Sequence, residues 1–422
     1  MRREADREDD RLASLAVILP LAFVGLVIVA GCWTLFAIAG VHLRAELDLT
    51  SLEFGLLLAM PMAVSALLAI PAGMAAQAFG ARRVMLVCLA GLALCMVVLL
   101  VTDTYPGYLL AAGGLGLAGG FYSAGLQFVT GHCDQKRLGL ALGVFGAGVT
   151  GAGFNYYLVP LFHEAFSWQA VPLAYLIVLL LILALFLLLT NPDDEDPDPQ
   201  LETSVRGSLK LLRHQTIWQL SAYFGVVAGS FLALALWLPD YLSAQFGLSV
   251  TAGAGLAQGF VIPGALAQIA GGSLSDRFGS TRVINYSMLL ALAALLVLSY
   301  PPMTLAIQGV DKTIDVEFAL PVVLESIFVV VLGLAMGGAM GGLQRMAILA
   351  GRQAAGFVAG LLLVSACTVA FVLPVIFGAV NLWLGVRTTA FMILFGLLVG
   401  CLALFYWNSR QQERQRLLQP GT

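Results

Sequence analysis

The chain has 422 residues, of which 60% are hydrophobic and 11% charged, and its formal net charge is −3. A soluble globular protein carries about 25% charged residues, so this composition excludes an ordinary soluble enzyme. The basic tracts are too short to grip a phosphate backbone, which excludes a nucleic-acid partner. The 46 glycines fit closely packed transmembrane helices, in which small residues let the backbones approach each other.

Apolar stretches recur along the whole chain, and a helix needs about 20 such residues to cross a bilayer. We predict twelve spans, at 14–41, 54–76, 84–102, 108–130, 138–161, 170–190, 216–238, 251–275, 283–300, 320–349, 354–380 and 388–407. The first is too long for a signal peptide and lacks a convincing cleavage site, so we keep it as a membrane helix. The expected fold class is an all-α integral membrane protein that occupies the lipid bilayer.

One long polar segment, 191–215, separates the sixth predicted helix from the seventh. It divides the chain into an N-terminal half (1–190) and a C-terminal half (216–422) with six helices each. Its acidic, proline-rich beginning is typical of a solvated linker. Its basic part, 206–214, is either a short helix on the membrane surface or an unspecific solvated loop.

Lys and Arg residues are distributed unevenly over the predicted loops. With a cytoplasmic N-terminus, the inner loops and tails hold 17 of the 21 Lys and Arg residues and the outer loops hold three. Basic residues concentrate on the cytoplasmic side of membrane proteins. We therefore expect an inner-membrane protein of a bacterial cell, with both termini in the cytoplasm.

The two halves repeat each other in sequence. The segment PAGMAAQAFGARR (71–83) corresponds to AGGSLSDRFGSTR (270–282). Its matches share an offset of 199, and pair Gly73, Gly80 and Arg83 with Gly272, Gly279 and Arg282. A second repeat pairs Gln127 with Gln344. Duplicated six-helix halves are typical of transporters, with the substrate site between the halves near the bilayer midplane.

The segment GGSLSDRFGSTR resembles the loop motif of the major facilitator superfamily. The residues that carry the resemblance are Gly272, Asp276, Arg277, Gly279 and Arg282. The glycines permit a tight turn between helices. The acid and the arginines can pair with each other and with helix ends, and so latch the cytoplasmic side. Gln77 stands in the first half where Asp276 stands in the second, so we expect a lopsided latch that depends more on Asp276.

Three further segments are similar to the nitrate/nitrite porter family of that superfamily. They are GLAGGFYSAGLQFVTGHCDQKRLGLALGVFGAGVTGAG (116–153), WTLFAIAGVHLRAEL (33–47) and AMPMAVSALLAIPAG (59–73). The resemblance covers nearly the whole membrane domain. It implies the major facilitator fold and a transporter, not an enzyme.

The resemblance also implies an arginine four residues before the motif glycine in each half, and this pair holds nitrate in that family. The corresponding residues here are Ala69 and Gln268, and neither is cationic. Two asparagines of the family's fifth-helix signature correspond to Phe145 and Thr150. Because a desolvated anion at the midplane needs compensating charge or many donors, we expect a substrate that has diverged from nitrate.

Neutral polar and aromatic residues inside the predicted helices are the candidate substrate ligands. They are Gln268, which occupies the family's ligand position, and Tyr223, Gln127, Gln344, Trp33, Asn155 and Tyr156. Hydrogen bonds between helices explain such residues about as often as ligand contacts do. Both interpretations stay open at this point.

Two ionisable residues lie within the predicted spans, Glu325 and Arg345. Glu325 is either a proton-coupling carboxylate or an acid at the outer rim, near water. Arg345 either snorkels or pairs structurally, or takes part in substrate binding or gating. The candidate coupling or gating residues are these two with Asp276, Arg277, Arg282 and Arg83.

We expect no metal and no cofactor, because the His and Cys residues show no ligand spacing and no phosphate-binding loop is present. The preferred interpretation is a monomeric secondary active transporter of a small molecule or small ion, with or without a coupled proton. The alternative is a transport-inactive sensor or assembly subunit on the same fold. A central cavity packed with apolar side chains would favour the alternative.

Overall fold

Within its described residues, the computed structural model contains twelve helical spans of membrane length, as the sequence predicts. The structure describes residues 2–37, 43, 47–190, 205–301, 303–308 and 313–418. Arg44, Lys312 and the acidic part of the linker lie outside the described residues. The composition, the twelve spans and the fold establish an integral membrane protein of the all-α class.

The first half consists of eight described α-helices. They are α1 (Arg2–Trp33), α3 (Ser51–Phe79), α4 (Ala81–Val101), α5 (Tyr105–Leu115), α6 (Leu117–His132), α7 (Leu138–Gly146), α8 (Thr150–Ala165) and α9 (Ala170–Leu189). The fourth predicted helix is thus broken into α5 and α6 at Gly116. The fifth is α7 and α8, joined by a single 3₁₀ turn at Ala147–Val149.

The short helix α10 (Val205–Lys210) and a 3₁₀ turn lead into the second half. The half consists of α11 (Gln215–Phe246), α12 (Val250–Phe278), α13 (Ser280–Leu298), α14 (Val322–Ala350), α15 (Ala355–Leu384) and α16 (Thr389–Leu418). Helix α10 shows that part of the basic segment is helical. Helices α11 and α16 continue beyond their predicted ends, and α1 begins before its predicted start.

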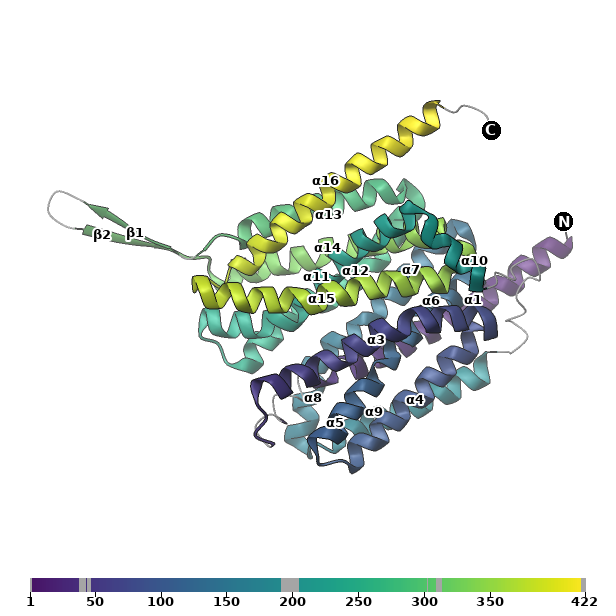
Figure 1. The fold of residues 1–422 in the computed structure, drawn as a ribbon, viewed down its shortest axis with the longest axis horizontal. Helices are drawn as coiled ribbons and strands as arrows, with labels where there is room; N and C mark the ends of the chain where they lie inside the picture. Colours follow the sequence, from purple (N-terminus) through teal and green to yellow (C-terminus); the bar gives the residue numbers. More distant parts are fainter. Residues whose placement is uncertain are drawn as a thin grey trace.

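A β-hairpin between α13 and α14 is the element that the sequence analysis does not predict. Strands β1 (Met303–Gln308) and β2 (Thr313–Phe318) pair antiparallel, with Met303 opposite Phe318. The hairpin projects beyond the helices at the end opposite the two chain termini (Figure 1). We call these two ends of the molecule the hairpin end and the terminal end.

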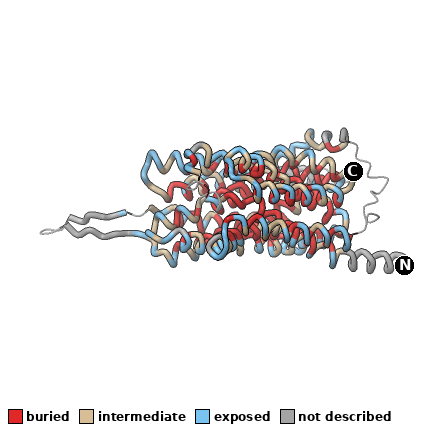
Figure 2. Tube along the Cα trace, turned by 90° about the horizontal axis from the view of Figure 1, so that it is seen from below, coloured by how far each residue is buried: buried red, intermediate tan, exposed pale blue. Residues whose placement is uncertain are grey.

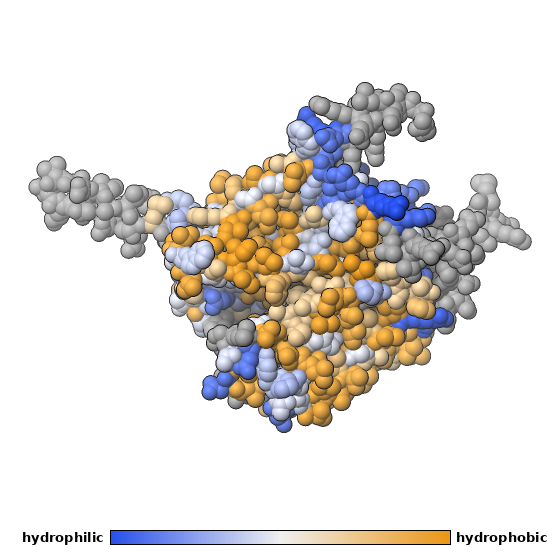
Figure 3. Space-filling view, in the orientation of Figure 1, coloured by the Kyte–Doolittle hydropathy of each residue, from blue (hydrophilic) through white to orange (hydrophobic). Residues whose placement is uncertain are grey.

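The two halves form two bundles that lie side by side, coloured purple to blue and teal to yellow in Figure 1. Buried residues run through the centre of the molecule, and exposed ones lie on the outside (Figure 2). Apolar residues cover much of the flank, whereas hydrophilic residues gather toward the ends (Figure 3). This distribution is the one that a bilayer requires.

Glycines at related positions bring the halves together. A Cβ on Gly139 would lie 2.3 Å from the carbonyl oxygen of Gly272, and one on Gly73 would lie 2.1 Å from that of Gly356. These contacts lie at two helix crossings, α7 against α12 and α3 against α15. The crossings are equivalent, because Gly73 corresponds to Gly272 at the offset of 199 and Gly139 to Gly356 at the offset of 217. The turns after α3 and α12 contain Gly80 and Gly279 at φ 93° and 85°, a conformation that favours glycine.

Candidate functional site

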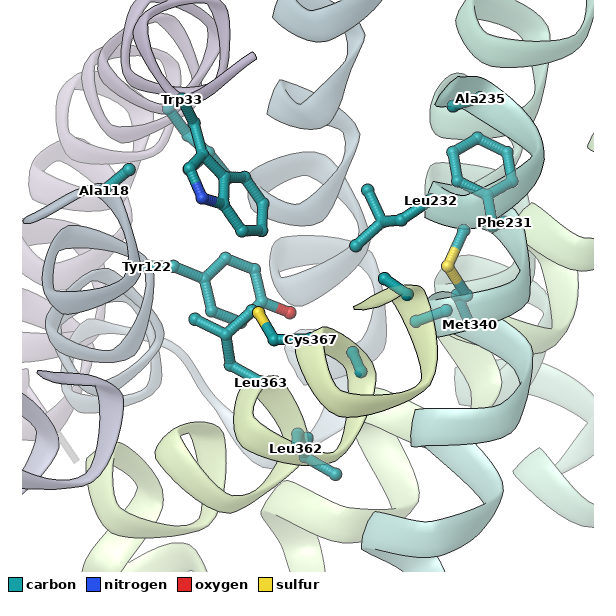
Figure 4. Packing of buried hydrophobic residues seen from close by; sticks show 14 of the residues in the cluster. Trp33, Ala118, Tyr122, Phe231, Leu232, Ala235, Met340, Leu362, Leu363 and Cys367 are labelled. Carbon is teal, nitrogen blue, oxygen red and sulfur yellow. The ribbon is translucent and has the colours of Figure 1, made fainter. Parts of the chain in front are cut away.

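A cavity of about 50 Å³ lies between the two halves. Its walls include Leu26, Trp33 and Tyr122 from the first half, and Phe231, Gln268 and Met340 from the second. Trp33 and Tyr122 face Leu232 and Met340 across this space, and Leu363 lies below Tyr122 in this view (Figure 4). No charged side chain lines the cavity in the part of the chain that the structure describes.

Gln268 reaches the cavity from α12 and is 3% exposed. Its Nε2 donates a hydrogen bond of 3.2 Å to the carbonyl oxygen of Gly146, at the end of α7 in the other half. Ala69, which occupies the equivalent position in α3, is fully buried and is not a lining residue. The two family ligand positions are therefore unequal, because only the second carries a polar side chain into the cavity.

Tyr122 is the second polar side chain of the wall, and Gln344 holds it in place. The Gln344 Nε2 donates to the Tyr122 hydroxyl oxygen at 3.1 Å, so the Tyr122 proton is free to be donated elsewhere. Gln344 is itself fully buried behind the wall. A Cβ on Gly146 would lie 2.5 Å from Oε1 of Gln268 and 3.1 Å from Oε1 of Gln344. The two amide oxygens therefore converge on Gly146, and a side chain there would displace the Gln268 amide.

Two other predicted ligands lie at or near the cavity. Trp33 forms part of the wall, and its indole Nε1 donates to the carbonyl oxygen of Pro61 at 3.3 Å, which fixes the ring. The hydroxyl of Tyr156, on α8, donates to the carbonyl oxygen of Ala235, on α11, at 2.6 Å. Tyr156 lines a smaller cavity of about 10 Å³ that shares Leu232 with the central one.

Asn155 and Tyr223 have polar partners within their own halves. Asn155 donates to the carbonyl oxygen of Gly31 and to Thr34, and accepts from the Tyr175 hydroxyl, which ties α8 to α1 and α9. The Tyr223 hydroxyl accepts from Asn408, on α16, at 2.6 Å. Neither residue lines the central cavity, and the neighbour of Tyr223, Phe224, lines it instead.

A cluster at the terminal end joins the halves through Asp276. Its two carboxylate oxygens accept hydrogen bonds from the backbone N–H groups of Gly139 (2.9 Å) and Leu140 (2.8 Å), at the start of α7. Arg345 forms an ion pair with the same carboxylate at 2.6 Å and donates to Ser280. A negative charge at a helix N-terminus is stabilised by the helix dipole. We call Asp276, Arg345 and the start of α7 the acidic latch.

The first half has no acidic latch, and a different residue takes the capping position. Gln127 accepts from the backbone N–H of Gly356, at the start of α15, at 2.7 Å. Gln77 instead accepts from the Ser208 hydroxyl of the linker helix α10. Phe128 occupies the position equivalent to Arg345, at the offset of 217. Both charges of the ion pair are therefore missing from the first half.

The other arginines of the loop motifs do not join the latch. Arg277, Arg282 and Arg83 are exposed, and Arg83 donates to the carbonyl oxygen of Phe79 at the end of its own helix. Arg82, which the sequence analysis does not single out, is buried and binds Thr190 at the end of α9. The sequence repeat matches its neighbour Arg83 and not Arg82, so it did not mark the buried arginine of the pair.

Sequence reasoning also missed a second contact beside the latch. Arg352 donates to the carbonyl oxygen of Cys133 at 3.0 Å and so joins the α14–α15 connection to the end of α6. Cys133 is buried there, and burial raises the pKa of its thiol to about 11. Arg352 stands in a predicted inner loop with ordinary composition, so no sequence signal marked it.

Glu325 lies near the hairpin end of α14 and is 3% exposed, so its side chain is buried within the protein. The Tyr241 hydroxyl of α11 interacts with its carboxyl group. One oxygen of Glu325 and the Tyr241 hydroxyl lack a well-formed hydrogen bond, and no described Lys or Arg pairs with the carboxylate. Tyr241 stacks on Trp237 at 4.6 Å, which encloses this site with aromatic rings.

The profile of the Major Facilitator Superfamily matches residues 21–374. Among curated proteins, the chain is 28% identical to a probable nitrate/nitrite antiporter, NarK1, of Thermus thermophilus. The alignment has 433 positions and covers 98% of this chain and 96% of that protein. It is 26% identical to the nitrite extrusion protein of Bacillus subtilis over 67% of this chain and 72% of that protein.

Solved structures show the same fold. The transporter FucP in its outward conformation matches with a TM-score of 0.73 and 16% identity, over 93% of this chain and 99% of its own. The human organic anion transporter MFSD10 matches with a TM-score of 0.72 and 17% identity, over the same shares of the two chains.

Proposed function

Since this chain belongs to the Major Facilitator Superfamily, we propose that its two halves rock about the central cavity and carry a small uncharged solute across the membrane. The relatives named above transport nitrate or nitrite by their names. The substrate proposed for this chain is uncharged and so differs from nitrate and nitrite, whereas the proposed transport mechanism is the same.

The observation that carries this proposal is the chemistry of the cavity wall. The described lining is apolar apart from the Gln268 amide, the Tyr122 hydroxyl and the Trp33 indole, and the last already has a partner. A desolvated anion without a cation costs several kcal/mol, whereas a neutral polar group needs only a hydrogen-bond partner. Tyr122 supplies a donor and Gln268 supplies a carbonyl oxygen, which together suit an uncharged solute that both accepts and donates.

The orientation of the protein follows from its charges. We place both termini and the linker in the cytoplasm of a bacterial cell and the hairpin outside, because basic residues concentrate at the terminal end. In this orientation the acidic latch closes the cytoplasmic side. We further propose that the two halves act as a monomer, because the cavity lies within one chain.

Coupling to a proton is proposed at Glu325. A buried carboxylate without a paired cation is stable only when it is neutral, and a proton is the smallest cation that neutralises it. No group of three or more His, Cys, Asp or Glu residues within the described part of the chain is arranged to hold a metal ion. Transport driven by a pH gradient should therefore be lost in Glu325→Gln, while exchange of solute between the two sides persists.

A second candidate function rests on the same apolar wall. A sensor or assembly subunit that no longer transports needs no polar path, and a cavity of about 50 Å³ is small. Uptake of labelled solute into proteoliposomes separates the two functions. A transporter fills the vesicles, whereas a sensor binds its ligand and leaves the vesicles empty.

The proposed substrate class is tested by thermal unfolding of the purified full chain with nitrate, nitrite, urea, acetamide and phenol. A ligand at one hundred times its Kd stabilises the folded state by about 2.7 kcal/mol. We expect stabilisation by at least one neutral solute, and loss of that effect in Gln268→Met. Stabilisation by micromolar nitrate in the native chain would overturn the proposal. Ala69→Arg with Gln268→Arg should recover nitrate binding.

A further inference from the structure

The cross-half hydrogen bonds are distributed unequally along the central interface. At the terminal end, Asp276, Gln127 and Arg352 each bind backbone groups of the opposite half. Gln268 and Gln344 cross at the level of the cavity. Toward the hairpin end, the Tyr156 hydroxyl donates a hydrogen bond across the interface to the carbonyl oxygen of Ala235.

The acceptor of this bond is available because of a proline. In an α-helix the carbonyl oxygen of residue 235 receives the N–H of residue 239. Residue 239 is Pro, which has no N–H, and it lies inside α11. The Ala235 carbonyl therefore lacks its intrahelical partner. A hydroxyl that arrives from α8 satisfies an oxygen that would otherwise be buried without a hydrogen bond.

The position of the bond gives it a function. Tyr156 and Ala235 line the small cavity on the hairpin side, and Leu232 separates that cavity from the central one. Tyr156 and Ala235 therefore lie on the hairpin side of the central cavity.

We propose that the Tyr156 hydroxyl and the Pro239-freed carbonyl of Ala235 form the outer gate of the central cavity. This gate rests on the alternating access proposed above, and it assigns Tyr156 to closure and not to substrate binding. The outer gate is a neutral hydrogen bond, whereas a charge-assisted network joins the halves at the terminal end. Neutral bonds contribute less, so the outer gate opens more readily than the terminal end.

The gate is tested by access to the cavity, without any transported solute. Ala30 lines the central cavity, so Ala30→Cys reports on water reaching it. Cells that carry this cysteine are treated with an impermeant maleimide from outside, and modification of residue 30 is followed by mass spectrometry. Tyr156→Phe removes the hydroxyl and keeps the ring. We expect labelling to be roughly 3- to 10-fold faster, the effect of losing one neutral hydrogen bond.

The matched control is Tyr157→Phe, because the adjacent Tyr157 is 64% exposed and has no role in the gate. Its labelling rate should equal that of the parent. Pro239→Ala restores an N–H that competes for the Ala235 oxygen, so it should also increase the rate. An unchanged rate in folded Tyr156→Phe, or an equal increase in Tyr157→Phe, overturns the gate. An unchanged rate in Pro239→Ala overturns the role of the proline.

This experiment is independent of the proposed substrate. A protein that binds nitrate still shows the labelling difference if the gate is correct. The same labelling in inside-out vesicles, where the reagent meets the terminal end, should show no acceleration in Tyr156→Phe. A comparable acceleration from both sides would mean that the variant loosens the whole interface, and it would also overturn the gate.

Discussion

The substitution Asp276→Asn tests the acidic latch most directly. The carboxylate accepts two backbone hydrogen bonds from the start of α7 and pairs with Arg345 at 2.6 Å. Each charge-assisted bond contributes about 1.5–3 kcal/mol, against about 0.5–1.5 kcal/mol for a neutral one. An Asn side chain has one acceptor oxygen and no charge, so one of the two backbone hydrogen bonds from α7 is lost and the other becomes neutral. We expect the state closed at the terminal end to lose about 3 kcal/mol relative to the open state, roughly a 100-fold change in their ratio.

A native thiol reports on this change. Cys133 is buried between the halves beside the latch, and burial raises its pKa to about 11. At pH 8 only about 0.1% of such a thiol is ionised, whereas a solvated thiol with a pKa near 8.5 is about one quarter thiolate. Opening of the terminal end therefore exposes Cys133 to water and, at the same time, lowers the pKa of its thiol. Maleimide labelling of Cys133 at pH 8 in open membrane fragments should be much faster in Asp276→Asn.

Two control variants separate opening from a direct effect of the charge. Arg345→Gln keeps the Asp276 charge near Cys133 and breaks the ion pair, so it should also accelerate labelling. Gln77→Ala changes the equivalent position in the first half, which binds Ser208 and not the opposite half, so its rate should stay near that of the parent. Equal rates in the parent and in a well-folded Asp276→Asn would refute the latch. Equal acceleration in Gln77→Ala would refute its asymmetry.

Three further outcomes follow from contacts described above. Gly272→Ala should open the terminal end, because its Cβ would lie 2.0 Å from the carbonyl oxygen of Gly139. Gly255→Ala on the same helix is the control, because its Cβ would enter open space. The rate of Cys133 labelling compares the two variants, and an equal rate would contradict the close approach. Asn155→Leu should lower the free energy of unfolding by about 1–2 kcal/mol and leave the solute affinity unchanged, because the partners of Asn155 lie within one half. A large loss of affinity without a loss of stability would instead identify Asn155 as a substrate ligand. An engineered Asp196→Cys should resist an impermeant reagent outside intact cells, and rapid modification would reverse the proposed orientation.

The sequence was sufficient to predict the membrane helices, because each needs a long apolar run that few other structures contain. The repeat also located the latch residue Asp276 and the unequal pair of Ala69 and Gln268. Predicting partners was harder. Tyr223 and Phe224 are adjacent aromatic residues, and the rotation of α11 alone decides which one lines the cavity. Arg82 and Arg83 present the same ambiguity on α4.

The hairpin and the changed capping residue have a similar explanation. A strand that does not cross the bilayer needs no long apolar run. Residues 303–318 therefore lack the sequence pattern that marks the membrane spans. In the first half, Gln127 and not residue 77 caps the start of the opposite helix, α15. This exchange of the capping residue depends on how α3, α6 and α15 meet in space. No spacing along the chain encodes that meeting point, because the three helices are far apart in sequence.

The unequal caps of the two crossings set an order of events. The start of α15 is held by the neutral amide of Gln127, whereas the start of α7 is held by the Asp276 carboxylate with its arginine. When the terminal end separates, we expect the interface around α3 and α15 to yield before the one around α7 and α12. The opening would then begin as a wedge on one side of the molecule, with the α7–α12 crossing as its hinge. We expect solute and water to enter from that side, and salt in the surrounding solution to affect mainly the separation of α7 from α12.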